Sequence, residues 1–180
     1  DDSLHATADV LRVCQERCLT MSRFITSYAD VVKIPEANLM LTDLNERVYA
    51  CKEFMESMCN ERDIRLHVQL CDECVQVKID NVLFEQALVN ILKNAIESIG
   101  SDGDVYITTT AKPATLTIAD NGAGISPDIE NKLFSPFFSS KPDGQGLGLI
   151  FISDVLTKHN CLFSLRTFDD GLTRFSIRFK

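Results

Sequence analysis

The sequence predicts an α/β sandwich in which helices cover one face of a mixed, mostly antiparallel sheet, preceded by a long N-terminal helix. Three observations support this prediction. Segments with helical period alternate along the chain with segments whose apolar residues recur at every second position. Two pairs of strand-like segments follow each other through short turns, as hairpins do. The chain has 180 residues, 45% of them hydrophobic, so it can bury the core of one domain with an appendage.

The N-terminal third is predicted to be helical. Between residues 3 and 33, apolar residues step by three or four positions and form a narrow seam. The seam resembles coiled-coil packing, and a helix of this kind needs a partner helix. Pro35 ends this helix and opens a linker that reaches residue 41. A second helix begins around Asp43, which has capping-box spacing with Glu46, and runs to about Arg62.

The rest of the chain alternates strands with two helices. A broad apolar face predicts a helix over 81–99, ended by Gly100. A second helix from Leu147 to about His159 follows a long segment rich in glycine, proline and serine, and such long loops are usually lids or binding loops. Alternation predicts the strands 64–70, 75–79, 104–111, 114–120, 161–168 and 172–179, with turns at Lys112-Pro113 and at Asp169-Asp170-Gly171.

Composition excludes several classes of protein. The net charge of −8 argues against a nucleic-acid surface, and no run of 18 apolar residues provides a membrane segment in this chain. Seven cysteines without a signal sequence indicate reduced thiols in a cytoplasmic setting. Cys71 and Cys74 have C-x-x-C spacing but no second pair, so we interpret them as small hydrophobic residues at a turn. The chain begins with Asp1 instead of Met, which is consistent with a fragment of a longer, membrane-anchored protein.

The helix at 81–99 carries an unusual polar stripe. Asn90, Lys93, Asn94 and Glu97 recur at helical spacing on a surface with few other polar residues. An asparagine carbonyl is a neutral hard-oxygen ligand, suited to Mg²⁺ that already holds phosphate oxygens, and a lysine can neutralise a phosphate. The simpler alternative is that each amide caps a neighbouring loop.

One glycine-rich segment follows a predicted strand, and a second precedes a predicted helix. In DNGAG, Asp120 ends a strand and needs a donor partner, which a ligand amine would supply. An ordinary turn explains one of the two glycines, and the second also lets a flat group approach the backbone. GQGLGL precedes a helix, where free N–H groups can hold phosphate. It lacks both the dinucleotide-binding spacing and the P-loop Gly-Lys-Ser/Thr, so a flexible loop is the alternative.

Four segments occur together in an informative order: NILKNAIES, DNGAGI, LFSPFFSSK and GQGLGL. They resemble the asparagine box, first glycine box, phenylalanine box and second glycine box of bacterial two-component sensor histidine kinases. The resemblance covers 42–180 and implies the Bergerat ATP-binding fold of the GHKL superfamily. By the same resemblance, 1–34 corresponds to the C-terminal helix of a truncated dimerisation and phosphoacceptor bundle, and 35–41 is the linker.

The resemblance implies a role for individual residues, with ATP and Mg²⁺ as cofactors. Asn94 would coordinate Mg²⁺, Asn90 and Lys93 would line the phosphate site, and Asp120 would accept from the adenine amino group. Gln145 and Leu172 depart from the small residue and the glycine usual at their positions. The other implied positions are Gly122, Gly124 and Ile125 at the base, Phe134, Phe137 and Phe138 at a lid hinge, Lys141, Gly144, Gly146, Leu147 and Gly148 around the phosphates, and Thr173 behind the aspartate.

Asn90 separates this chain from related ATPases. Gyrase B subunits, heat-shock chaperones and mismatch-repair ATPases carry a glutamate there as general base for water. An amide cannot take a proton at neutral pH, so efficient hydrolysis is disfavoured. A kinase needs no base for a neutral imidazole, which is already nucleophilic.

The predicted function is therefore ATP-dependent phosphorylation of a histidine, relayed to a response-regulator receiver domain by a protein that dimerises through its N-terminal helix. His5, His67 and His159 all lack the acceptor motif, so we expect the acceptor upstream or in another protein. The alternatives are a serine kinase of the anti-sigma-factor type and a nucleotide-binding scaffold without transfer. The helix at 3–33 argues against the first, and the intact glycines and asparagines argue against the second.

Overall fold

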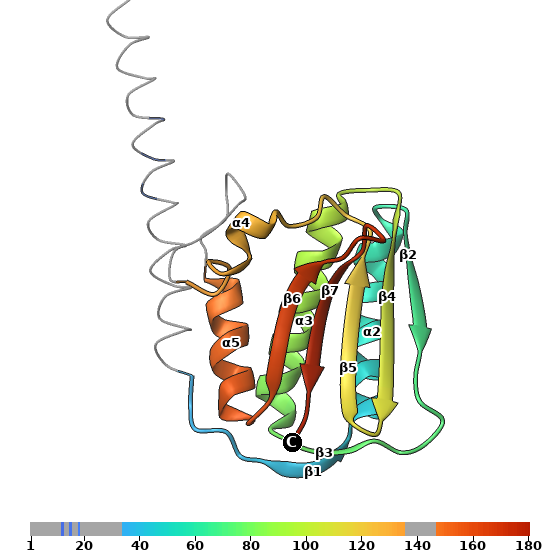
Figure 1. Cartoon of the computed structure of the whole chain (residues 1–180), viewed down its shortest axis with the longest axis vertical. Coiled ribbons are helices and arrows are strands. Elements are labelled where there is room, and N and C mark those ends of the chain that lie inside the picture. Colours follow the sequence, from blue (N-terminus) through green and yellow to red (C-terminus); the bar gives the residue numbers. More distant parts are fainter. Residues whose placement is uncertain (1–11, 13–14, 16–17, 19–33, 136–146) are drawn as a thin grey trace, which may run out of the picture.

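The computed structural model describes residues 34–135 and 147–180, together with Arg12, Gln15 and Cys18, which are helical and exposed. The rest of the predicted helix 3–33 lies outside the described residues. The elements follow one another as shown in Figure 1: β1 (Met40–Asp43), α2 (Leu44–Asn60), β2 (Ile64–Gln69), β3 (Gln76–Ile79), α3 (Asn81–Ile99), β4 (Gly103–Ala111), β5 (Ala114–Asp120), α4 (Pro127–Glu130), α5 (Gly148–Lys158), β6 (Leu162–Thr167) and β7 (Thr173–Arg178).

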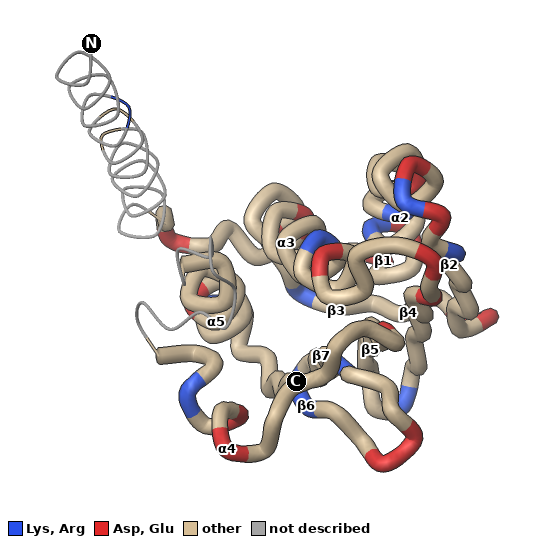
Figure 2. Tube along the Cα trace, turned by 90° about the horizontal axis from the view of Figure 1, so that it is seen from above, with Lys and Arg blue, Asp and Glu red and all other residues tan. Residues whose placement is uncertain are grey.

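The main sheet has five strands in the order β2-β4-β5-β7-β6. Only β2 and β4 pair in parallel, and the three other pairs are antiparallel. Helices α2, α3 and α5 lie together on one side of this sheet, as the view from above shows (Figure 2). The predicted sandwich with a mixed, mostly antiparallel sheet is therefore confirmed.

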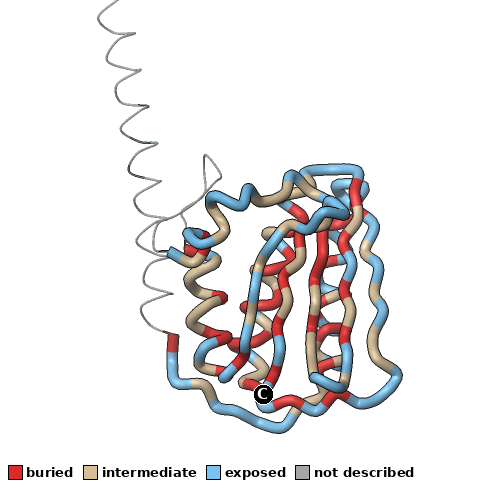
Figure 3. Tube along the Cα trace, viewed as in Figure 1, coloured by how far each residue is buried: buried red, intermediate tan, exposed pale blue. Residues whose placement is uncertain are grey.

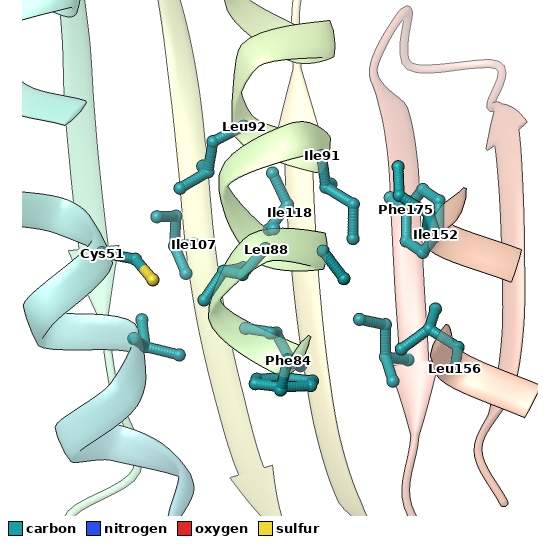
Figure 4. Close-up of a cluster of buried hydrophobic side chains, with 14 of the residues drawn as sticks. Cys51, Phe84, Leu88, Ile91, Leu92, Ile107, Ile118, Ile152, Leu156 and Phe175 are labelled. Atoms are coloured by element: carbon teal, nitrogen blue, oxygen red, sulfur yellow. The ribbon is translucent and has the colours of Figure 1, made fainter. Parts of the chain in front are cut away.

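The core lies between the three helices and the sheet. Buried residues alternate with half-buried or exposed residues along β4 and β7, and they recur at helical spacing along α3 (Figure 3). Leu88 and Leu92 of α3 point at Ile107 and Ile118 of the central strands, and Ile152 of α5 lies beside Phe175 of β7 (Figure 4). Burying such side chains contributes roughly 1.5–3 kcal/mol each, so α3, with apolar neighbours on both sides, is the best-anchored helix.

Helix α3 matches its predicted bounds. It begins because the Asp80 carboxylate accepts from the N–H groups of Val82 and Leu83, both at 3.1 Å. It ends at Gly100, whose φ of 81° is readily available to glycine. Since its apolar face is fixed by the core, the opposite polar stripe is also fixed in direction.

The expectation of a single sheet is wrong at its N-terminal side. Met40–Asp43, within the predicted linker and helix start, forms strand β1 and pairs antiparallel with β3 in a separate two-stranded sheet. Helix α2 therefore begins at Leu44, with Asp43 as its N-cap, and it ends at Asn60. The short helix α4 inside the long irregular segment was also not predicted. The other bounds agree with the predictions within one or two residues.

Candidate nucleotide-binding site

The polar stripe of α3 lies away from the core. The Asn90 side chain donates to the Gln86 carbonyl over 3.0 Å. The exposed Lys93 ammonium lies 3.8 Å from a carboxylate oxygen of Glu97. Asn94 is half-buried, and its amide has no hydrogen-bond partner within 34–135 and 147–180. The amide is not among the buried unpartnered atoms of the described residues, so its oxygen is accessible to a ligand.

The first glycine-rich loop packs onto the last turn of α3. Asp120, at the end of β5, is only 6% exposed and accepts from the Gly122 N–H over 3.0 Å. A Cβ on Gly122 would lie 2.4 Å from the Ser98 hydroxyl and 2.6 Å from its carbonyl carbon. The Ala123 N–H donates to the Ser98 carbonyl over 3.2 Å. Glycine at 122 is therefore required for the contact that joins the aspartate loop to the asparagine helix.

A pair of threonine hydroxyls supports the other side of this loop. The Ile125 N–H donates to Thr167 Oγ1 over 2.7 Å, and that oxygen lies 2.9 Å from Thr173 Oγ1. Thr173 is 4% exposed and pairs with Asp120 across β5 and β7. Gly124 has a φ of 77°, which favours glycine, and its Cβ position faces Thr167 at 3.5 Å. The two threonines thus connect the loop to the last hairpin.

Thr167 is not among the site residues predicted from the sequence. Its position could have been predicted, because a hairpin turn at Asp169-Asp170-Gly171 places Thr167 opposite Thr173, the register that β6 and β7 adopt. Asn121 was also missed. Its side-chain oxygen accepts from the Asp104 N–H over 2.8 Å, which ties the loop to β4.

The second glycine-rich segment is described only from residue 147 onward. Leu147 is buried and caps α5, where its carbonyl accepts from the Phe151 N–H over 3.0 Å. Gly148 is the first residue of α5, and a Cβ there would meet no atom of the described residues within 4 Å. Packing against the described residues therefore does not require this glycine. The predicted residues Phe137, Phe138, Lys141, Gly144 and Gly146 lie outside the described residues.

Phe134 lies at the start of the predicted lid hinge. Its ring meets Phe163 of β6 edge-on at 5.2 Å between centroids, and Phe175 of β7 at 6.4 Å. Such pairs add about 0.5–1.5 kcal/mol each beyond burial. The segment after α4 is therefore fixed to the sheet up to this position.

Within the described part of the chain, neither the metal-ligating side chains nor the cysteines form another reactive centre. There, no three His, Cys, Asp or Glu side chains are close enough together to hold a metal ion. The described cysteines are free thiols. Burial raises the pKa of Cys161 to about 12, and burial, followed by Glu85, raises the pKa of Cys51 to about 11. Such thiols are poor nucleophiles because the thiolate is scarce.

Within the described residues, no helix is long and apolar enough to cross a bilayer.

The candidate site is thus assembled at one end of the molecule. The C-terminal end of α3, the end of β5 and the start of α5 all lie toward the upper side of the coloured domain in Figure 1. The structure joins the glycine loop after Asp120 to Ser98, one turn after Asn94 on α3, and to Thr167 and Thr173 on β6 and β7. A sheet covered by three helices, with an amide-bearing helix packed against the loop of a buried aspartate, agrees with the fold that the sequence motifs imply.

Comparison with known proteins agrees with this arrangement. The profile of the histidine kinase-, DNA gyrase B- and HSP90-like ATPase family matches residues 79–180. The chain therefore belongs to this family, and it has the ATP-binding catalytic domain of a sensor histidine kinase.

The individual relatives that match this chain are sensor proteins. The chain is 27% identical to the sensor histidine kinase ZraS of Escherichia coli over 157 residues, which are 86% of this chain and 33% of ZraS. It is 32% identical over 143 residues to the C4-dicarboxylate transport sensor protein DctB of Rhizobium meliloti, covering 77% of this chain and 23% of DctB. The chain thus spans a third or less of these relatives.

Solved structures extend the likeness to the fold. The mycobacterial sensor histidine kinase MprB is 28% identical with a TM-score of 0.67, covering 78% of this chain and 96% of that one. The catalytic domain of the histidine kinase ThkA superposes with a TM-score of 0.72 at 23% identity, over 79% of this chain and 95% of that one. The likeness to ThkA supports the fold alone.

Proposed function

We propose that the protein containing this chain is a histidine protein kinase that uses ATP with Mg²⁺. The γ-phosphoryl group would pass to a histidine and then to an aspartate of a response-regulator receiver domain. The observation that carries the proposal is the half-buried Asn94 amide, without a protein partner in the described residues, on the helix that packs against the Asp120 loop.

The residues present fit the cofactors. Asn94 offers the neutral hard oxygen that Mg²⁺ accepts, and Mg²⁺ when bound neutralises and bridges phosphate oxygens. Lys93 is exposed on the same stripe and adds a positive charge near the phosphates. Asp120, which is buried and accepts from the Gly122 N–H, would accept from the adenine amino group. Ile125, Gly124 and the two threonines would fix the loop that faces the base.

Asn90 favours transfer over hydrolysis. Its amide donates to a carbonyl of its own helix and cannot take a proton from water. In the proposed transfer, the bond between the γ-phosphorus and the ADP oxygen breaks while a bond to the imidazole nitrogen forms. The imidazole proton then leaves to solvent, so the chain itself needs no general base. The protein contributes positioning and charge.

Partners and location follow from the same proposal. One solved structure holds the histidine kinase ThkA in complex with the response regulator TrrA, and this chain superposes on that kinase with a TM-score of 0.75 at 20% identity. We infer a receiver domain as the partner here, a homodimer formed through the segment 3–33, and a cytoplasmic catalytic domain, because ATP is available there.

The full-length protein tests this function with ATP labelled on its γ-phosphate. We expect label on the protein that is lost in acid and kept in base, as a phosphorus–nitrogen bond is, and transferred to a receiver domain. The Asn94→Ala variant should take up no label while keeping its fold by circular dichroism. Acid-stable label would identify a serine kinase, and no label on the full-length protein would leave a nucleotide-binding module. Either result would overturn the proposal.

A further inference from the structure

The segment 34–39, which we call the linker, is bonded to the domain at both of its ends. Ile34, at its start, is only 9% exposed and belongs to the hydrophobic core. Ala37 packs against the same core. In Figure 1 this segment passes the lower ends of α5 and α3 before it enters β1. Ile34 is therefore fixed to the domain.

Lys158, the last residue of α5, holds the start of this segment. Its ammonium donates to the Ile34 carbonyl over 2.8 Å and to the Pro35 carbonyl over 3.3 Å. It also lies 3.5 Å from a carboxylate oxygen of Asp154, one turn earlier. The side chain is 24% exposed, so water competes only partly for these bonds.

Asp80 holds the end of the segment and at the same time caps α3. One carboxylate oxygen accepts from the Asn38 N–H over 2.9 Å, while the other accepts from Val82 and Leu83 at the helix start. Burial opposes ionisation here, but the N–H donors of Leu83, Asn38 and Val82 keep the pKa of Asp80 below its ordinary value. The Asp80 carboxylate thus binds the linker and caps α3 at the same time.

His159 joins the two helix ends. The Asp80 N–H donates to His159 Nε2 over 2.9 Å, so Nε2 accepts and the proton lies on Nδ1, which donates to the Val155 carbonyl over 2.7 Å. The ring is 4% exposed and lies near Phe84, at 6.1 Å between centroids. Both ring nitrogens are used within the protein, which fixes the C-terminal end of α5 to the N-terminal end of α3.

The same two helices reach the nucleotide site at their other ends. Asn94 lies 14 residues after Asp80, about 21 Å along α3 at 1.5 Å per residue. Helix α5 starts at Gly148, next to the second glycine-rich segment, and ends at Lys158. Because both helices are packed in the core along their length, the contacts at their far ends help to fix their position relative to the sheet.

We propose that Asp80, Lys158 and His159 are positioning residues that fix the linker to the ends of α3 and α5. They set the direction in which the catalytic domain presents its nucleotide to the acceptor histidine. The inference rests on the proposed kinase function for its effect on transfer. The docking of the linker itself does not depend on that function.

Lys158→Met tests the inference in the full-length protein. Lys158→Arg keeps a donor and is the conservative variant. Lys52→Met is a matched control, because Lys52 on α2 pairs with the carboxylate of Glu56 one turn away, as Lys158 pairs with that of Asp154, and is 25% exposed, against 24% for Lys158. The readouts are hydrogen–deuterium exchange of the peptide covering residues 36–39, and the kcat and KM for ATP in phosphoryl transfer.

We expect Lys158→Met to speed exchange of this peptide at least tenfold and to lower kcat at least fivefold, with KM for ATP within twofold. Lys158→Arg should restore most of kcat, and Lys52→Met should change neither readout. Unchanged exchange in Lys158→Met would overturn the docking. Faster exchange with unchanged kcat, or a rise in KM alone, would overturn the positioning role. If the unaltered protein transfers no phosphoryl group, the proposed function fails, and exchange alone decides whether Lys158 docks the linker.

Discussion

The threonine pair behind the aspartate loop gives a prediction that can be worked out from distances. Thr167→Val removes the acceptor of the Ile125 N–H, 2.7 Å away, and the partner of the Thr173 hydroxyl, 2.9 Å away. Valine has nearly the shape of threonine, so the change removes hydrogen bonds without opening a cavity. An unsatisfied buried group costs about 1–3 kcal/mol, and Thr173 is 4% exposed.

We therefore expect Thr167→Val to lower the free energy of unfolding by about 2 kcal/mol. Thr173→Val loses only the shared bond, so about 1 kcal/mol is expected. The double variant should be less destabilised than the sum of the two, with a coupling of about 1 kcal/mol, because both single changes remove the same bond. If the loop faces the adenine, Kd for ATP should rise roughly tenfold in Thr167→Val, which corresponds to about 1.4 kcal/mol.

Urea unfolding followed by circular dichroism measures the change in the free energy of unfolding, and calorimetry measures Kd for ATP. Thr117→Val is the control, because this hydroxyl lies on the uncovered sheet face, 3.4 Å from Ser176 Oγ, where water can replace the contact. Its effect should stay within about 0.5 kcal/mol. Strictly additive effects of the two threonine changes, or an equal loss in Thr117→Val, would refute the reasoning.

Three further predictions follow from single sites. Asn90→Glu supplies a proton acceptor on the α3 stripe and should raise ATP hydrolysis at least about tenfold in a phosphate-release assay; unchanged hydrolysis would count against a water site there. The Arg65 guanidinium, followed by His67, holds the pKa of Asp104 well below its ordinary value, so the stabilisation from this carboxylate is present at neutral pH and is lost as the pH falls below about 4. Asp104→Asn should flatten acid unfolding in that window, and an unchanged acid profile would refute the pairing. Iodoacetamide near neutral pH should modify exposed Cys74 at least about tenfold faster than buried Cys161, with equal rates in denaturant; equal rates in the folded protein would contradict the burial.

Helix α3 could be predicted to the residue because its signals are local. A broad apolar face fixes its direction and Gly100 ends it, so the polar stripe could be recognised from the amino-acid sequence alone. The strands β4 to β7 alternate clearly around marked turns, which is why their bounds agree with the prediction.

Strand β1 could not be predicted in the same way. Leu39, Met40 and Leu41 are all exposed and do not alternate, and the strand exists because it pairs with β3, more than 30 residues away. Thr167 illustrates the same limit within the site. Its importance comes from strand register and from the Ile125 N–H, not from a motif. Long-range pairing is not encoded in a short window of sequence.

The central claim is that the Asn94 amide binds Mg²⁺ with ATP beside the Asp120 loop, and calorimetry of this chain with ATP, with and without Mg²⁺, tests it most directly. The account predicts one site whose affinity falls at least tenfold without Mg²⁺, and an Asn94→Ala variant in which Mg²⁺ no longer matters. Binding that is indifferent to Mg²⁺ in the unaltered chain, or a full Mg²⁺ effect in the Asn94→Ala variant, would contradict it.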